Sequence, residues 1–130
     1  MHGLEHVAIA VRSIPKAAQL YTDILGLKLS ETLQVPDEGI KIAVINAGGV
    51  NIELMEPTVE DSVVARFIQR RGEGIHHISF RITDLNQRLR HVQERGLELV
   101  FPQARTSPRG YRYNFIHPKS ANGVLIELTD

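Results

Sequence analysis

Small or polar side chains alternate with branched apolar ones along residues 4–11, the period of a strand with one buried face. The period then becomes helical, with Ser13 placed as an N-cap and Gly26 as the stop. The predicted inner face of this helix is apolar: Ile14, Ala17, Ala18, Tyr21, Ile24 and Leu25. Turn residues at 36–39 and 48–49 separate three further predicted strands, 27–35, 40–47 and 50–55. The first part of the chain therefore predicts a βαβββ module.

The same order of elements restarts after a linking helix at about 60–71. The apolar side of that helix is formed by Val63, Val64, Phe67 and Ile68, and Arg70, Arg71 and Gly72 end it. A strand at 75–83 follows, then a helix capped by Asp84, with Leu85, Leu89 and Val92 inward, that ends at Gly96. Three more strands are expected, at 97–101, 111–116 and 124–128. The loop 102–110 is rich in Pro, Gly and Arg, and is the segment we expect to be least ordered and a candidate lid. We predict an α+β fold in which residues 1–130 form one domain of two βαβββ modules, at about 4–56 and 75–129.

Composition restricts the class of partner. The 130 residues, 42% of them hydrophobic, suffice for one domain with a core. Fifteen basic and fifteen acidic residues leave no net charge, which argues against nucleic acid and favours a small-molecule partner. The absence of cysteine excludes disulfides and thiolate ligands. Because no apolar run could span a bilayer and the start lacks a basic flank with an apolar stretch, we expect a soluble, cytoplasmic protein without a membrane partner.

Each module carries one histidine and one glutamate at matching places. The segment 6–11 (HVAIAV) corresponds to 77–82 (HISFRI), and Glu53 in 52–54 corresponds to Glu127 in 126–128. Strand alternation sets His6 and His77 on a face of small residues, opposite the branched side chains that pack on helices. It also sets both glutamates on that face, where burial without a partner would cost several kcal/mol.

We therefore expect His6, Glu53, His77 and Glu127 to converge on one divalent metal ion. Nitrogen and oxygen donors without sulfur suit Co²⁺, Mn²⁺, Ni²⁺ or Zn²⁺, with positions open for water or substrate, and the donor types do not select one of these ions. A scaffold that binds its ligand without metal is the alternative. Of the other histidines, His76 should point to the opposite face, His91 lies on a predicted helix and His2 is near the terminus. A structural and a functional role both remain open for His117.

Three stretches carry a family resemblance: 71–77 (RGEGIHH), 117–120 (HPKS) and 123–128 (GVLIEL). In these the chain resembles the methylmalonyl-CoA epimerases of the vicinal oxygen chelate group, which also includes glyoxalase I and extradiol dioxygenases. The resemblance covers residues 6–128 and implies an open, cup-shaped sheet of paired βαβββ modules around a metal, commonly in a homodimer. It implies interconversion of the (2R) and (2S) forms of methylmalonyl-CoA through a metal-stabilised enolate, with a CoA thioester as the partner.

The same resemblance assigns roles to individual residues. His6, His77 and Glu127 match the metal ligands, and Glu53 matches a fourth position that is Gln in some members. Ile42 departs from members that carry a carboxylate there as a proposed base, so we predict that Glu127 and Glu53 transfer the proton. Candidate substrate-binding donors are Lys119, Ser120 and Arg112.

Other functions remain as alternatives. Glyoxalase I would use a similar His and Glu site on a glutathione adduct. An extradiol dioxygenase would bind Fe²⁺ with His6, His77 and Glu127. A binding module of the same fold would sequester a small ligand without catalysis.

Overall fold

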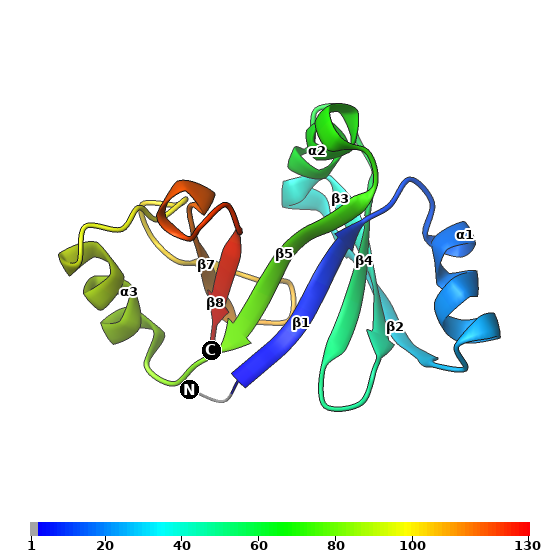
Figure 1. The fold of residues 1–130 in the computed structure, drawn as a ribbon, viewed down its shortest axis with the longest axis horizontal. Coiled ribbons are helices and arrows are strands. Elements are labelled where there is room, and N and C mark those ends of the chain that lie inside the picture. Colours follow the sequence, from blue (N-terminus) through cyan, green and yellow to red (C-terminus); the bar gives the residue numbers. More distant parts are fainter. Residues whose placement is uncertain (1–2) are drawn as a thin grey trace. The chain divides into compact units, whose positions relative to one another are not determined.

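The computed structural model describes residues 3–130, so His2 lies outside the described residues (Figure 1). Contacts within the chain divide it into two compact units, one of residues 6–76 and the other of residues 77–130 together with residues 3–5. The strands run in the order β2-β3-β4-β1 in the unit of residues 6–76 and β5-β8-β7-β6 in the other, so each unit has its own mixed run of strands. The predicted α+β class with two βαβββ modules is confirmed.

The unit of residues 6–76 contains most of β1 (Gly3–Ala10), followed by α1 (Ile14–Gln19), β2 (Lys28–Val35), β3 (Ile40–Asn46), β4 (Asn51–Pro57) and α2 (Val63–Arg71). A π-helical turn, η1 (Leu20–Ile24), extends α1, and a 3₁₀ turn, η2 (Pro36–Glu38), joins β2 to β3. Strands β1 and β4 are parallel, and β3 is antiparallel to both β2 and β4. Gly39 ends η2 with φ +65, and a Cβ there would collide with Val59, so this turn requires glycine.

Two apolar clusters pack on opposite faces of these strands. Ile9, Val11 and Leu54 pack with Ala17 and other residues of α1, as the alternation predicted. On the other face, the cluster of Ala8, Ala10, Val35, Ile40, Met55, Val64 and Ile68 joins the strands to α2, with Ile42 against it. The helices therefore fix both faces of the strands that carry His6 and Glu53.

The predicted inner face of the first helix is wrong at its end. Ile24 and Leu25 are 75% and 56% exposed. The Leu25 amide donates to the Leu20 carbonyl, five residues back, so the π turn holds an extra residue and rotates the last side chains outward. Val63, the first residue of α2, is also exposed, in contrast to its predicted position.

The unit of residues 77–130 contains most of β5 (Gly74–Arg81), then α3 (Leu85–Glu94), β6 (Arg105–Thr106), β7 (Arg112–Ile116) and β8 (Ile126–Thr129). A 3₁₀ turn, η3 (Pro118–Ser120), lies between the last two strands. Strands β5 and β8 are parallel, and β7 is antiparallel to β8 and β6. Asp84 caps α3 by accepting from the Gln87 amide, and the predicted inner residues Leu85, Leu89 and Val92 are buried against β5 and β8.

The strand predicted at 97–101 is wrong. That segment makes a single bridge, Leu99 to Ile116. Beyond it, the Phe101 amide and carbonyl bond to the side chain of Asn114, at 3.2 and 3.0 Å, and Pro102 has no amide to continue a ladder. The short β6 instead lies inside the predicted loop 102–110. Within the described residues, no helix has the length and apolar character needed to cross a membrane.

Candidate metal centre

The first histidine and glutamate lie on adjacent parallel strands. His6 on β1 is 2% exposed and Glu53 on β4 is 4% exposed. The register pairs Glu53 with Ala8, two residues beyond His6 and on the same face. The His6 Nδ1 atom lies 3.1 Å from Glu53 Oε2. The strand period and the parallel register thus bring this predicted pair together.

The second pair repeats the arrangement on β5 and β8. His77 and Glu127 are 6% and 7% exposed, and Glu127 is the register partner of Ser79, two residues beyond His77. The His77 ring meets the Phe115 ring edge to face, with centroids 5.1 Å apart, which limits rotation of the imidazole. The duplicated positions therefore hold the same donor types on equivalent strands.

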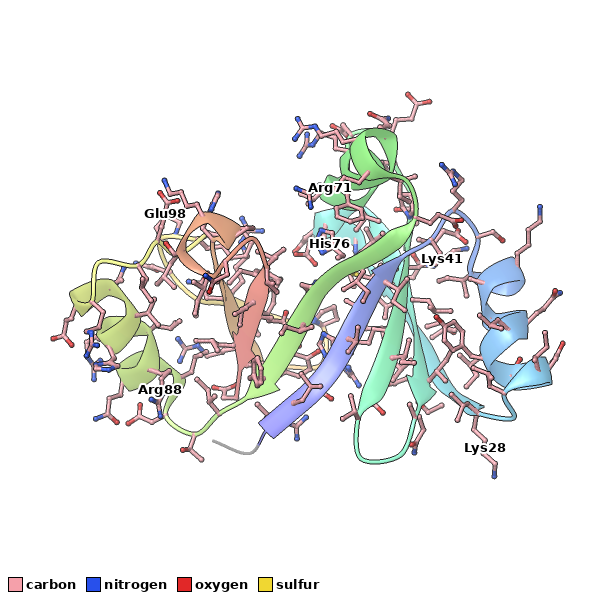
Figure 2. The ribbon with its side chains drawn as sticks, viewed as in Figure 1. Lys28, Lys41, Arg71, His76, Arg88 and Glu98 are labelled. Carbon is pink, nitrogen blue, oxygen red and sulfur yellow. The ribbon has the colours of Figure 1, made fainter. Side chains whose placement is uncertain are left out.

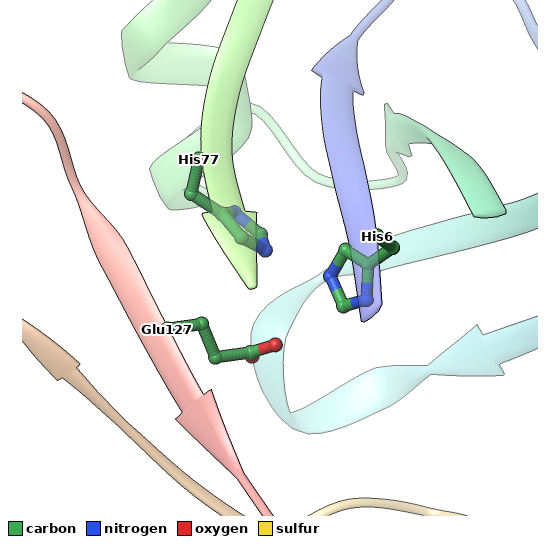
Figure 3. Close-up of side chains that lie close together, drawn as sticks. All are labelled: His6, His77 and Glu127. Carbon is green, nitrogen blue, oxygen red and sulfur yellow. The ribbon is translucent and has the colours of Figure 1, made fainter. Parts of the chain in front are cut away.

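Three of the four predicted ligands can offer donor atoms to one ion. One atom each from His6, His77 and Glu127 lies within 4.8 Å of the others, and Figure 3 shows these side chains turned toward one another. Two imidazole nitrogens and a carboxylate oxygen, all buried, form a donor set suited to a divalent transition metal. The residues present therefore fit a metal ion.

A second group contains a residue that our sequence analysis did not single out. Ligand atoms of Glu5, His6 and Glu53 also lie within 4.8 Å of one another. The available signal was a carboxylate directly before the first histidine. Because strand alternation favours the other face for Glu5, the sequence pattern alone argued against it.

Aromatic rings flank Glu127. Phe115 is the register partner of Glu127 on β7, and Tyr113 lies two residues before it. The rings of Phe101, Tyr113 and Phe115 pack edge to face, with 5.9 to 6.4 Å between their centroids. The Arg105 guanidinium carbon lies 3.7 Å from the Phe101 ring centre. This apolar flank excludes water from one side of the carboxylate, which strengthens its interaction with a cation.

The predicted substrate-binding residues lie on the turn η3 and on β7. Lys119 Nζ is 3.0 Å from Glu98 Oε2, and Ser120 Oγ accepts the Glu98 amide at 3.0 Å. Arg112 donates from Nη2 to Asn86 Oδ1 on α3 at 2.7 Å. These contacts fasten the turn and the strand to neighbouring segments, while the role of the three residues toward a substrate stays a prediction.

Two other histidines have structural partners. His117 caps η3, because its Nδ1 accepts the Lys119 amide at 3.1 Å. His76 meets the Phe67 ring edge to face at 5.0 Å, and lies on β5 after α2, which carries Arg71 (Figure 2). Burial, and then the charge of Arg71, lower the pKa of His76 to about 4. His76 is therefore neutral at physiological pH.

The comparisons with known proteins agree with this geometry. The sequence model of the glyoxalase/bleomycin resistance protein/dioxygenase superfamily matches residues 5–115. The chain belongs to this superfamily. A curated member, the mitochondrial methylmalonyl-CoA epimerase of Homo sapiens, is 34% identical over 126 residues, which is 96% of this chain and 72% of the human protein.

Solved structures of the superfamily match over nearly the whole chain. The methylmalonyl-CoA epimerase of Mycobacterium tuberculosis has a TM-score of 0.91 and 41% identity, over 98% of this chain and 86% of that one. A hypothetical protein of Bacillus halodurans has a TM-score of 0.94 and 41% identity, over 97% of this chain and 91% of that one. A variant of the Streptomyces coelicolor epimerase was solved with 2-nitronate-propionyl-CoA, at 28% identity, TM-score 0.92 and coverage of 99% and 96%. The Streptomyces coelicolor epimerase therefore binds this CoA derivative on the same fold.

Proposed function

We propose that this chain is a metal-dependent methylmalonyl-CoA epimerase, which interconverts the (2R) and (2S) forms. The observation that carries the proposal is the duplicated set of buried His and Glu residues, in a chain that is similar over its full length to named epimerases. Similarity supports the substrate, and the donor set supports the chemistry.

The reaction inverts a carbon between a thioester and a carboxylate. Its proton must leave from one face, and a proton must return to the other, so two positioned groups are needed. When bound, a divalent ion supplies positive charge that offsets the negative charge developing on the thioester oxygen, a contribution of several kcal/mol. We propose His6, His77, Glu127 and Glu53 as its ligands and Co²⁺ as the preferred ion.

The two glutamates are the proposed proton-transfer groups. Ile42 cannot serve, because its hydrocarbon side chain has no group that accepts or donates a proton, and it packs against the apolar cluster of Ala10, Met55 and their neighbours. Glu53 and Glu127 occupy matching positions in the two modules, each one strand away from its histidine. We propose that one carboxylate removes the C2 proton and that the other returns a proton on the opposite face.

The remaining parts of the proposal concern substrate binding, oligomeric state and location in the cell. Lys119, Ser120 and Arg112 are proposed as donors to the malonyl carboxylate or the CoA phosphates. We also propose that the protein works as a homodimer in the cytoplasm.

Exchange of the C2 hydrogen tests the reaction directly. The chain is incubated with one epimer of methylmalonyl-CoA in deuterated water, with Co²⁺ and separately with excess chelator. Deuterium should enter at C2, and the other epimer should form, only when Co²⁺ is present. Absence of exchange with every divalent ion tried, or equal exchange with chelator, would rule out the proposed function. A glyoxalase would convert the adduct of methylglyoxal and glutathione. A parallel assay with these two compounds should therefore show no turnover.

A further inference from the structure

The residues beside the two glutamates differ between the modules. Glu53 lies between Ala8 on β1 and Val44 on β3, both apolar. Glu127, at the matching place, lies between Ser79 on β5 and Phe115 on β7. The second module thus has a hydroxyl where the first has a methyl group.

The Ser79 hydroxyl is buried without a hydrogen-bond partner. Ser79 has no exposed surface, and its Oγ bonds to no other group among the residues that the structure describes. Buried hydroxyls in native proteins nearly always have a partner, so an unpartnered one indicates a role in a functional site. Strand alternation sets Ser79 on the face of His77, the face that the predicted metal ligands occupy.

The chemistry of a metal-bound carboxylate supplies such a partner. When one oxygen of a glutamate binds a cation, its other oxygen is usually held by a hydrogen-bond donor. The side chain of Phe115 offers no donor, and the Thr129 hydroxyl, two residues along β8, already donates to the Arg112 carbonyl at 3.0 Å. Ser79, the cross-strand partner of Glu127, carries a hydroxyl on the same face of the sheet.

We propose that Ser79 is a positioning residue for the metal centre: its hydroxyl donates to the second oxygen of the Glu127 carboxylate and orients Glu127 toward the metal ion. This inference rests on the proposed function, because it takes Glu127 as a ligand. It adds that the two glutamates are held differently. The Ser79 hydroxyl on β5 orients Glu127, whereas Glu53 contacts the His6 imidazole.

Substitutions at Ser79 that separate the hydroxyl from side-chain volume test the proposal. Ser79→Thr keeps the hydroxyl and adds a methyl group. Ser79→Val has nearly the shape of the threonine variant but lacks the hydroxyl, and Ser79→Ala removes the hydroxyl without added volume. Thr129→Val is the matched control, because it removes another buried hydroxyl on the same strand as Glu127. The readouts are Co²⁺ affinity, by competition with a chromophoric chelator, and the visible absorption spectrum of the bound Co²⁺.

The expected result is Co²⁺ binding about 10- to 100-fold weaker in Ser79→Ala and Ser79→Val, with an altered spectrum. Ser79→Thr and Thr129→Val should bind Co²⁺ as the unmodified chain does. Equal affinity in the unmodified chain, Ser79→Ala and Ser79→Val would overturn the proposal.

The design also handles misfolding and a failed metal site. If circular dichroism shows that Ser79→Thr or Ser79→Val is misfolded, the comparison of Ser79→Ala with the unmodified chain and with Thr129→Val decides. An unmodified chain that binds no Co²⁺ and exchanges no C2 hydrogen would instead overturn the proposed function itself.

Discussion

The imidazole of His6 and the carboxylate of Glu53 form a buried pair, with 3.1 Å between Nδ1 and Oε2. The two residues come from neighbouring parallel strands and lie 47 positions apart in the chain. Burying either group alone would be costly, and the contact offsets part of that cost.

Glu53→Gln should separate metal binding from proton transfer. The amide oxygen can still coordinate a cation, but the group can no longer accept a proton, so kcat should fall by about 10²- to 10⁴-fold with Co²⁺ affinity nearly kept. Steady-state epimerisation and Co²⁺ titration measure the two effects. Glu56→Gln on the same strand is the control, since Glu56 bonds to the Ile14 amide and Lys41 and should affect stability alone. Full activity of Glu53→Gln would remove Glu53 from the proposed bases.

Loss of one imidazole should abolish stabilisation by metal. A ligand present at 100 times its Kd raises the free energy of unfolding by about 2.7 kcal/mol, because it binds the folded state alone. Saturating Co²⁺ should therefore raise the unfolding midpoint of the unmodified chain and leave that of His77→Ala unchanged. His91→Ala, an exposed change on α3, should keep the shift. Differential scanning fluorimetry gives the answer, and a normal shift in His77→Ala would show that His77 is not a ligand.

Asn114 should matter for stability more than its polarity suggests. Its side chain is fully buried and bonds to the amide and carbonyl of Phe101 and to the Phe115 amide at 2.7 Å. Asn114→Leu should lower the free energy of unfolding by about 2–4 kcal/mol, since it leaves the Phe101 backbone groups unpaired. Asn46→Ala, which removes one exposed bond to the Gly48 amide, should cost less than about 1 kcal/mol. Urea denaturation measures the free energy of unfolding of both variants. Equal losses in the two would contradict the role given to Asn114.

His76 should make the metal-free chain less stable in mild acid. Its pKa is lowered from 6.5 to about 4 in the folded state, so the unfolded state binds the proton more readily. Its contribution is fully present above about pH 6.5 and is lost as the pH falls toward 4, by about 1–3 kcal/mol. His76→Phe should show a smaller fall over that range in urea denaturation. Parallel curves for the two proteins would mean that other groups carry the pH dependence.

Lys119→Ala should raise KM for methylmalonyl-CoA with kcat unchanged, if the ammonium meets an anionic part of the substrate. Its ion pair with Glu98 is exposed and contributes at most about 1 kcal/mol to stability, so folding should be intact. Lys41→Ala removes a comparable pair, Lys41 to Glu56 at 3.2 Å, and should leave KM as it was. An unchanged KM in Lys119→Ala would make this lysine part of a turn and nothing more.

The sequence predicted the candidate ligands because they depend on short-range rules. Strand alternation and the repeat of His6 and Glu53 in His77 and Glu127 require no knowledge of distant contacts. The misplaced segment 97–101 depends on Asn114, whose amide occupies backbone groups thirteen residues away in the chain. Ile24 and Leu25 were misplaced because a π turn shifts the helical phase, and no residue type announces that shift. The difference between Ala8 and Ser79 was visible in the sequence, but its meaning required the register with the two glutamates.

All four candidate ligands extend from strands, and none extends from a connecting loop. Ladder hydrogen bonds set their spacing, so insertions or deletions in the segments between strands can alter which molecules gain entry without moving the donors. A register slip of one residue, in contrast, would turn a donor to the opposite face of its strand and destroy the centre. New specificity on this framework can therefore arise in the connections, while the strands keep the positions of the donor side chains.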